Sequence, residues 1–322
     1  MTAIRRHMTA ILTATILLAV PALSHAETVR IGLPTKTYWP TTVAEAAKAQ
    51  KLFEKEGITA EITIYRGGAE CFEALAAGAA DIILDAPALP AAGRKKGVMS
   101  KAVANGAMGN FGWQLMVLAK SPLEVKDLNG KKVGITSAGS GSDLLALWTI
   151  QDRKIDFTRV PVGGGGLVPN LLAGNIDAAV VYSPLSFQIK KSGEARTLID
   201  YAASVPPNLT SVWIATDKYI KEKPEAVQKA LNALYGGLMY MRGNREAAVK
   251  LIGELYEMPA EIATAEYENT ILKLETDGNM AGDRIVAATQ LSLDMAKMGG
   301  MKDLVPASDI ILTGFTPVPT KP

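Results

Sequence analysis

The clearest pattern of apolar and polar positions is a segment that occurs twice, 96 residues apart. Residues 75–87 read LAAGAADIILDAP and residues 171–184 read LLAGNIDAAVVYSP, so a leucine, a glycine and an aspartate recur before an apolar run that ends near a proline. Glycine commonly closes a helix, and a short apolar run bounded by turn residues is typical of a buried strand. A period of this length is too long for a solenoid repeat and is about the size of one lobe.

The similarity extends upstream to residues 61–68, EITIYRGG, and residues 157–164, FTRVPVGG, each an apolar-patterned strand that ends in glycines. A further strand and helix precede each of them, VRIGL before TTVAEAAKAQKLFEKEG and KKVGI before GSDLLALWTIQDR. Strands that alternate with helices form parallel βαβ units. We therefore predict an α/β fold of two lobes, each built on a doubly wound sheet.

Two strand-like segments, residues 110–120 and 210–220, are expected to carry the chain from the first lobe to the second and back. The rest of the chain is rich in helix formers with apolar spacings of three and four, which predicts C-terminal helices packed on lobe 1. The closing TPVPTKP is expected to be extended and exposed. The predicted ranges are 27–115 for the first part of lobe 1, 116–208 for lobe 2, and 209–322 for the return strand and C-terminal helices.

The first 26 residues differ from the rest of the chain. Arg5 and Arg6 precede the apolar run TAILTATILLAV, which is too short to span a bilayer, and small residues occupy positions 24 and 26. This order is typical of a secretory signal peptide cleaved after Ala26. A buried N-terminal helix is the alternative, which the strand-like ETVRIGL that follows disfavours. No cysteine sits at the cleavage site to accept a lipid, so we predict a soluble periplasmic protein.

Charge and rare residues exclude several classes of function. Without the two arginines of the signal, 32 basic residues face 32 acidic ones, so we expect no nucleic-acid partner. Both histidines, His7 and His25, lie in the signal, and Cys71 is the lone cysteine. A Ser-His or Cys-His nucleophile is therefore excluded from the mature chain. Cys71 is predicted to be a small buried hydrophobe.

Ligands of doubly wound sheets bind at the carboxyl ends of the strands, where loops lead into helices. Aromatic residues in these loops suit an organic ligand, because they bury area while offering a polar tip. They are Tyr38, Trp39, Tyr65 and Tyr182. An apolar setting favours a core or hinge position for the other tryptophans, Trp113, Trp148 and Trp213.

The loop TSAGSGSD contributes the candidates Ser137, Ser140 and Ser142 at the start of a predicted helix. Unpaired N–H groups there would favour a negative group. Alternatively, Ser140 and Asp143 form a capping box, with no ligand contact. An exposed contact of this kind is worth about 0.3–1 kcal/mol, whereas burying an aromatic side chain contributes about 1.5–3 kcal/mol. The aromatic loops are thus expected to dominate binding.

Three further candidates lie in lobe 1. Asp85, at a strand end, could accept a hydrogen bond from a ligand amine or hydroxyl, or bind backbone N–H groups of its own turn. Arg66 could pair with an anionic ligand or be solvated, and Gly68 belongs to the same loop. The glycines at 163–166 match neither a P-loop nor a dinucleotide fingerprint, which favours a tight turn at the cleft.

Together these features resemble the periplasmic substrate-binding proteins of ABC transporters, in the group that binds nitrate, sulfonates, taurine and thiamine pyrimidine precursors. The resemblance rests on VRIGLPT with YWP, on SPLEVKDLNGKKVGITSAGSGSDLLAL, on LLAGNIDAAVVYSP and on DKYIKEKPEAVQKAL, and covers most of residues 28–235. It implies a periplasmic binding protein fold of two lobes joined by a two-strand hinge, which close on a small molecule. Tyr38, Trp39 and Asp85 depart from typical sulfonate binders.

From the resemblance we expect a monomeric binding protein without cofactor or metal, which delivers its ligand to an ABC permease in the inner membrane. A small organic ligand, sulfonate-like or pyrimidine-like, is expected rather than a bare inorganic ion. The alternative is an enzyme like the pyrimidine-forming relative on this fold, which relies on histidine and iron and is disfavoured here by the lack of histidine. A ligand-sensing domain would need a fused DNA-binding or transmembrane segment, and none is visible.

Overall fold

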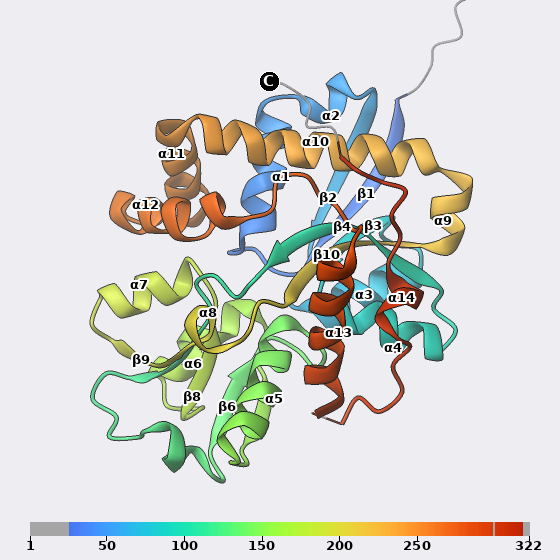
Figure 1. Ribbon diagram of the computed structural model, residues 1–322. Coiled ribbons are helices and arrows are strands. Elements are labelled where there is room, and N and C mark those ends of the chain that lie inside the picture. The colour runs from blue at the N-terminus through green and yellow to red at the C-terminus, as the bar shows by residue number, and fades with distance from the viewer. Residues whose placement is uncertain (1–25, 299, 318–322) are drawn as a thin grey trace, which may run out of the picture.

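The structure is a computed structural model that describes residues 26–298 and 300–317. The predicted signal peptide lies outside the described residues except for Ala26, as does most of the TPVPTKP segment. Two five-stranded sheets with helices packed around them form two lobes, one above the other in Figure 1. The predicted two-lobed α/β fold is confirmed.

The sheet of lobe 1 has the strand order β2-β1-β3-β10-β4. β1 is parallel to β2 and β3, whereas β10 is antiparallel to β3 and β4. The strands are β1 (Glu27–Leu33), β2 (Ile58–Ile64), β3 (Ile82–Asp85), β4 (Ser100–Met108) and β10 (Leu209–Thr216). The helices between them are α1 (Trp39–Ala49), α2 (Leu52–Lys55), α3 (Gly68–Ala76) and α4 (Ala88–Lys95).

The sheet of lobe 2 has the equivalent order β7-β6-β8-β5-β9. Its strands are β5 (Gln114–Leu118), β6 (Lys132–Ile135), β7 (Thr158–Pro161), β8 (Ala178–Val181) and β9 (Ala195–Asp200). Its helices are η1 (Val125–Leu128), α5 (Gly141–Arg153), η2 (Gly164–Gly166), α6 (Leu167–Leu172), α7 (Leu185–Lys191) and α8 (Tyr201–Ser204). β5 is antiparallel to β8 and β9, and the chain changes lobes just before it, so a boundary at residue 115 falls within this strand.

The recurring aspartates explain why the same pattern occurs in both lobes. In lobe 1 the Asp81 N–H donates to the carbonyl of Arg30, and the Asp81 carboxylate accepts the Arg30 N–H, each over 2.8 Å. In lobe 2 Asp177 makes the same two bonds to Lys132, again over 2.8 Å. Each aspartate therefore fixes the start of β3 or β8 against the neighbouring parallel strand, where the chain has just left a helix.

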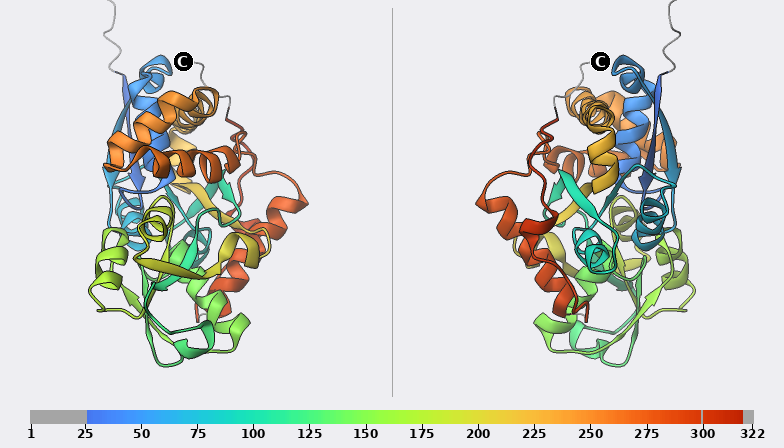
Figure 2. Two further views of the ribbon diagram at one scale, coloured as in Figure 1. Left: turned by 90° about the vertical axis from the view of Figure 1, so that its left-hand side faces the viewer. Right: turned by 90° about the vertical axis from the view of Figure 1, so that its right-hand side faces the viewer.

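The C-terminal helices cover one side of lobe 1 and also reach lobe 2. α10 packs on α1, while α12 contacts α7, and α13 contacts β10, α4 and, in lobe 2, α5. Figure 2 shows α13 running down the side of the molecule from lobe 1 to lobe 2. These helices are α9 (Asp217–Glu222), α10 (Pro224–Gly243), α11 (Arg245–Tyr256), α12 (Ala260–Asn269), η3 (Ile271–Lys273), α13 (Asp283–Met298) and α14 (Ala307–Ile310).

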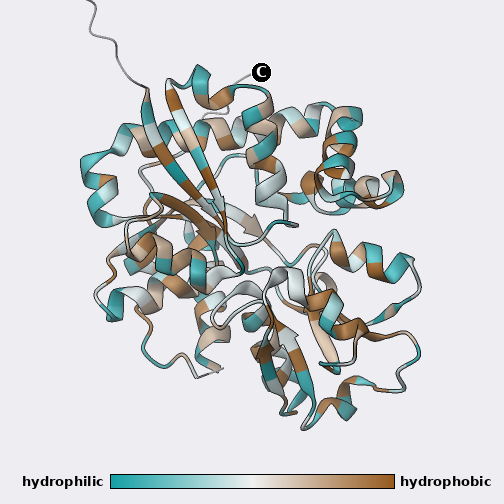
Figure 3. Cartoon of the chain, turned by 180° about the vertical axis from the view of Figure 1, so that it is seen from behind, coloured by the Kyte–Doolittle hydropathy of each residue, from teal (hydrophilic) through white to brown (hydrophobic). Residues whose placement is uncertain are grey.

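The hydrophobic residues gather on the central strands of each lobe, and hydrophilic residues are frequent on the outer faces of the helices (Figure 3). All four residues of β3 and of β8 are buried, as expected for strands that are covered on both faces. Among the residues that the structure describes, no helix combines the length and apolarity that a membrane span requires.

Candidate ligand site

A cavity lies where the two lobes meet. Its volume is about 40 Å³, taken as the space open to the centre of a water-sized sphere, which is room for about three water molecules. The wall combines Tyr38, Gly68 and Asp85 of lobe 1 with Ser140 and Tyr182 of lobe 2. These five were among the residues predicted to bind ligand.

Both crossovers between the lobes also reach the cavity, through Asn110 and Trp113 on the first and Asn208 on the second. Asn110 Nδ2 donates to Asn208 Oδ1 over 2.9 Å, and Asn208 Nδ2 donates to Ser292 Oγ on α13 over 3.1 Å. The two crossovers and α13 are therefore joined by side-chain hydrogen bonds at the floor of the site.

Three aromatic rings pack against one another on the cavity wall. Tyr38 precedes α1, Trp113 lies on the first crossover, and Tyr182 follows β8. The ring centroids lie 5.7 Å apart for Tyr38 and Trp113, and 5.2 Å apart for Tyr182 and each of the other two. Such edge-on and tilted packing is the preferred arrangement of aromatic pairs. The wall therefore offers a rigid apolar surface to a ligand.

The lobes contact each other directly around the cavity. The Tyr182 hydroxyl and Thr35 Oγ1 lie 2.7 Å apart, the Ala69 N–H donates to Ser137 Oγ over 3.1 Å, and the Gly164 N–H donates to the Arg66 carbonyl over 2.9 Å. At a second contact, the hydroxyls of Ser183 and Thr270 lie 2.7 Å apart. The structure thus shows the lobes closed on one another.

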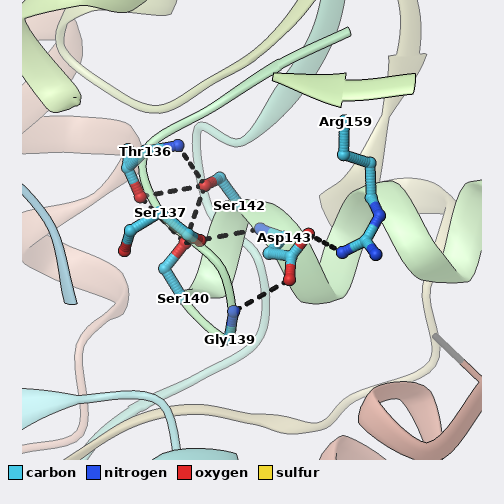
Figure 4. A network of polar contacts seen from close by, with 7 residues as sticks. All are labelled: Thr136, Ser137, Gly139, Ser140, Ser142, Asp143 and Arg159. Carbon is cyan, nitrogen blue, oxygen red and sulfur yellow. Dashed lines mark hydrogen bonds and ion pairs between the residues drawn. The ribbon is translucent and has the colours of Figure 1, made fainter. Parts of the chain in front are cut away.

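The serine-rich loop before α5 is held by its own hydrogen bonds (Figure 4). Ser140 Oγ donates to the Ser137 carbonyl over 2.7 Å and accepts the Asp143 N–H over 3.5 Å, which is the capping geometry. Ser142 Oγ accepts the Thr136 N–H over 2.8 Å. Ser140 therefore caps α5 while it lines the cavity, and Ser142 holds the loop against Thr136.

Asp143 occupies the first turn of the same helix. Its buried carboxylate accepts the Gly139 N–H over 2.8 Å and forms an ion pair with Arg159 of β7. The ion pair is neutral overall. The side chains at the start of α5 therefore add no net charge to the site. Gly141, the first residue of α5, lines the cavity, and the first N–H groups of a helix have no partner within the helix.

Among the residues that line the cavity in the described ranges, Asp85 is the only aspartate, glutamate, lysine or arginine. It is 4 % exposed, and its Oδ1 accepts the Ala86 N–H over 2.8 Å. Oδ2 has no hydrogen-bond partner within residues 26–298 and 300–317. Burial raises the pKa of Asp85 to about 7, although the bond from Ala86 opposes this shift.

Gly68 lets the backbone of α3 approach the Asp85 carboxylate closely. A Cβ atom at position 68 would lie 2.4 Å from both carboxylate oxygens, which no side chain can do without displacing Asp85. The glycine requirement here follows from space rather than from backbone conformation. The first turn of α3 also places the positive end of the helix dipole near the carboxylate.

The remaining predicted site residues lie away from the cavity. Trp39 is 3 % exposed and sits in the core of lobe 1, beside Trp213 and α10. Tyr65 is half-buried against Gly32, the Arg66 side chain is exposed, and Ser137 bonds to lobe 1 at the rim. Trp39 thus lies in the core rather than in the cavity wall, whereas Trp113 lies on a crossover, one of its two expected positions, and also lines the cavity.

Cys71 is buried, as predicted, and burial raises the pKa of its thiol. Within the described part of the chain, no group of three or more His, Cys, Asp or Glu residues is arranged to hold a metal ion. Burial likewise raises the pKa of Tyr182 and of Tyr38, so both phenols are neutral near pH 7.

Two α/β lobes that close on a shared cavity define the class of two-lobed periplasmic binding proteins. The sequence profile of the family described as NMT1/THI5 like matches residues 42–248, and the chain belongs to this family. It is also 27 % identical, over 276 residues, to a Brucella abortus protein that is named as a candidate binding protein, with 81 % of this chain and 84 % of the relative covered.

Solved structures show the same fold. The alkanesulfonate-binding protein of Xanthomonas axonopodis pv. citri, bound to MOPS, superposes with a TM-score of 0.74 at 19 % identity and covers 87 % of this chain and 95 % of its own. The periplasmic aliphatic sulphonate binding protein of Escherichia coli gives 0.72 at 19 % identity, with 92 % and 95 % covered. These likenesses confirm the predicted periplasmic binding protein fold, and the match to the NMT1/THI5 like family agrees with the predicted resemblance.

Proposed function

We propose that the protein is a periplasmic solute-binding protein that captures a small organic molecule between its lobes and delivers it to an ABC permease in the inner membrane. The observation that carries the proposal is the cavity whose wall comes from both lobes and both crossovers. A ligand that contacts both lobes stabilises only the closed state, so that capture and closure are one event. The family and the named relatives support this function.

The lining favours an organic ligand with a planar or apolar body. Tyr38, Trp113 and Tyr182 supply a packed aromatic surface, and Gly141 at the start of α5 is the place for an acceptor group. A bare inorganic anion is disfavoured, because among the described residues the wall contains an acidic side chain, Asp85, and no lysine or arginine. An enzyme is disfavoured as well, because the described residues contain no histidine to act as a base near neutral pH.

The test starts from protein purified without unfolding, from which native mass spectrometry identifies any co-purified small molecule. After that molecule is removed, adding it back should reduce the radius of gyration in small-angle scattering, because the lobes close. A scattering curve that does not change at saturation would contradict capture by closure.

Two tryptophan variants test whether this cavity is the binding site. Trp113→Ala removes a cavity wall and should weaken binding of the co-purified molecule at least about tenfold. Trp148→Ala is the matched control, because Trp148 is equally buried but packs on Tyr201, with ring centroids 6.0 Å apart. It should lower stability and leave the affinity unchanged; equal affinities for the two variants would place the ligand elsewhere.

A further inference from the structure

The Asp85 carboxylate lacks the partner that a buried charge requires. Its Oδ1 accepts one backbone N–H, and its Oδ2 has no partner within the described ranges. Removing a carboxylate from water costs several kcal/mol unless a cation or several donors replace the water. No lysine or arginine lines the cavity where the chain is described. The chain therefore supplies half of an ion pair, and this half is on the wall of the ligand cavity.

A purely structural role does not explain the acidic side chain. The bond from the Ala86 N–H needs only one oxygen, which an asparagine would also provide. Asp85 helps to raise the pKa of two nearby groups, the Tyr38 phenol, before α1, and the Cys71 thiol of α3, and burial keeps both neutral near pH 7. Within the described ranges neither of its oxygens is ion-paired, so the neighbouring strands β1 and β10 contribute no charged partner to it. The carboxylate fits only because residue 68 is a glycine, since a Cβ atom there would overlap both carboxylate oxygens.

We propose that Asp85 binds an ammonium group, or another cationic N–H donor, of the captured molecule, so that the ligand class is small organic amines. The inference rests on the proposed function and adds the charge that the ligand must carry. The aromatic rings of Tyr38 and Trp113 on the same wall suit a cation, because ring faces attract positive charge. The small volume suits an alkylammonium group, with the ligand body along the aromatic wall.

Binding of a cation should be linked to release of a proton. Below about pH 7 the free Asp85 is largely protonated, and an ammonium group binds the ionised form. The affinity should therefore rise as the pH rises to about 7, and then stay level until the ligand amine loses its own proton near pH 10. A ligand that binds the neutral acid would show the opposite trend.

The experiment uses three probes of similar size, propylammonium, 1-propanol and propionate, at millimolar concentration and about pH 8. Saturation-transfer NMR on ligand-free protein should detect propylammonium alone. Asp85→Asn should weaken its binding at least about tenfold, and should raise the thermal midpoint, since it removes the unpaired charge. A merely damaged fold would lower the midpoint.

Glu266→Gln is the matched control, because Glu266 is another buried carboxyl whose oxygens lack a hydrogen-bond partner in the described part of the chain, but it does not line the cavity. It should raise the thermal midpoint and leave propylammonium binding no weaker. Equal binding of propionate, unchanged binding in Asp85→Asn, or no binding of propylammonium by a protein that does hold a co-purified molecule would each overturn the inference. The proposed function fails separately, if no molecule is captured or the lobes do not close.

Discussion

The two lobes present the same local geometry to the cavity with different chemistry. Gly68 and Gly164 are equivalent positions of the repeat, and Asp85 and Tyr182 both stand two residues before the proline that follows. A Cβ at Gly68 would lie 2.4 Å from the Asp85 oxygens, and one at Gly164 would lie 2.5 Å from the Tyr182 hydroxyl. In each lobe a glycine thus allows the backbone to touch the polar group at the strand end.

What differs is the partner of that polar group. The Tyr182 hydroxyl is satisfied by Thr35 of the other lobe, whereas the Asp85 carboxylate keeps one oxygen without a partner in the described chain. Lobe 2 therefore uses its group to hold the lobes together, whereas we propose that lobe 1 leaves its group for the ligand. The two halves of the repeat share their backbone geometry. They differ in the side chain at the strand end, which in lobe 2 contacts the other lobe and in lobe 1 is proposed to contact the ligand.

The largest effect is expected from Gly68→Ala, which removes this geometry in lobe 1. The added methyl group overlaps both Asp85 oxygens, so the carboxylate must leave its place. We expect binding of the co-purified molecule to fall by about 100-fold, with a loss of about 1–3 kcal/mol in unfolding free energy from overpacking. Titration calorimetry and chemical denaturation measure the two effects.

Gly165→Ala is the control for Gly68→Ala, because a Cβ atom there meets no atom within 4 Å. It should change neither quantity. If Gly68→Ala kept its affinity within about threefold, the close approach of α3 to Asp85 would have no role in recognition, and the contrast between the lobes would be lost.

The sequence predicts which loops form this site better than it predicts which of their side chains face the cavity. The sequence indicates the strand-end loops, because parallel strands bring their carboxyl ends to one edge, and most of these loops line the cavity, although the glycines at 163–166 do not. Tyr38 and Trp39 could not be told apart from the sequence, because a helix rotates successive residues by about 100°. Since α1 starts here, Tyr38 faces the cavity and Trp39 faces the core.

Other parts of the site left no usable signal in the sequence. Trp113 lies in an apolar segment that reads as a strand, and only the position of the crossover brings it to the cavity. The contribution of α13, through Met295 and Ser292, depends on how a C-terminal helix packs across two lobes, which apolar spacing alone does not fix. The fold itself was predictable because its two halves repeat the same βαβ signals.

An intermediate effect is expected from Glu266→Gln, near the turn that follows β8 in lobe 2. In this turn Ser183 occupies the position equivalent to Ala86. There the acid comes from the opposite lobe: Glu266 of α12 is fully buried beside Ser183 and Thr270. Those hydroxyls favour the ionised form, but they bond to each other, and neither Glu266 oxygen has a partner in the described chain. Burial dominates and raises the pKa of Glu266 from its ordinary 4.5 to about 7.

The sign of the pH effect follows from this raised pKa. The folded protein holds the Glu266 proton more tightly than the unfolded chain, so the unfolding free energy falls as the pH rises from 4.5 to about 7, and is level above it. Glu266→Gln removes this loss. Its advantage over the wild type should grow from near zero at acidic pH to about 3 kcal/mol above pH 7, measured by denaturation across that range. A constant difference at all pH values would mean that Glu266 does not titrate there.

The smallest effect is expected where the two lobes are most alike, at the aspartates of the repeat. Asp81 and Asp177 each accept one backbone N–H over 2.8 Å, but Asp81 also receives the Nε and Nη2 groups of Arg30 over 3.0 and 2.5 Å. Arg30 is 41 % exposed, so solvent screening reduces the worth of that ion pair to about 0.2–1 kcal/mol.

Asp177→Ala should therefore cost about 1 kcal/mol of unfolding free energy, for the single hydrogen bond to the backbone. Asp81→Ala should cost about 0.2–1 kcal/mol more, and only this extra part should disappear in high salt or in an Arg30→Ala background. The four variants are Asp177→Ala, Asp81→Ala, Arg30→Ala and the double variant of Arg30 and Asp81. Urea denaturation of each, at low and at high ionic strength, measures these differences. Equal costs that do not respond to salt would show that the backbone bond alone matters, and that the two lobes are equivalent at this position in chemistry as well as in geometry.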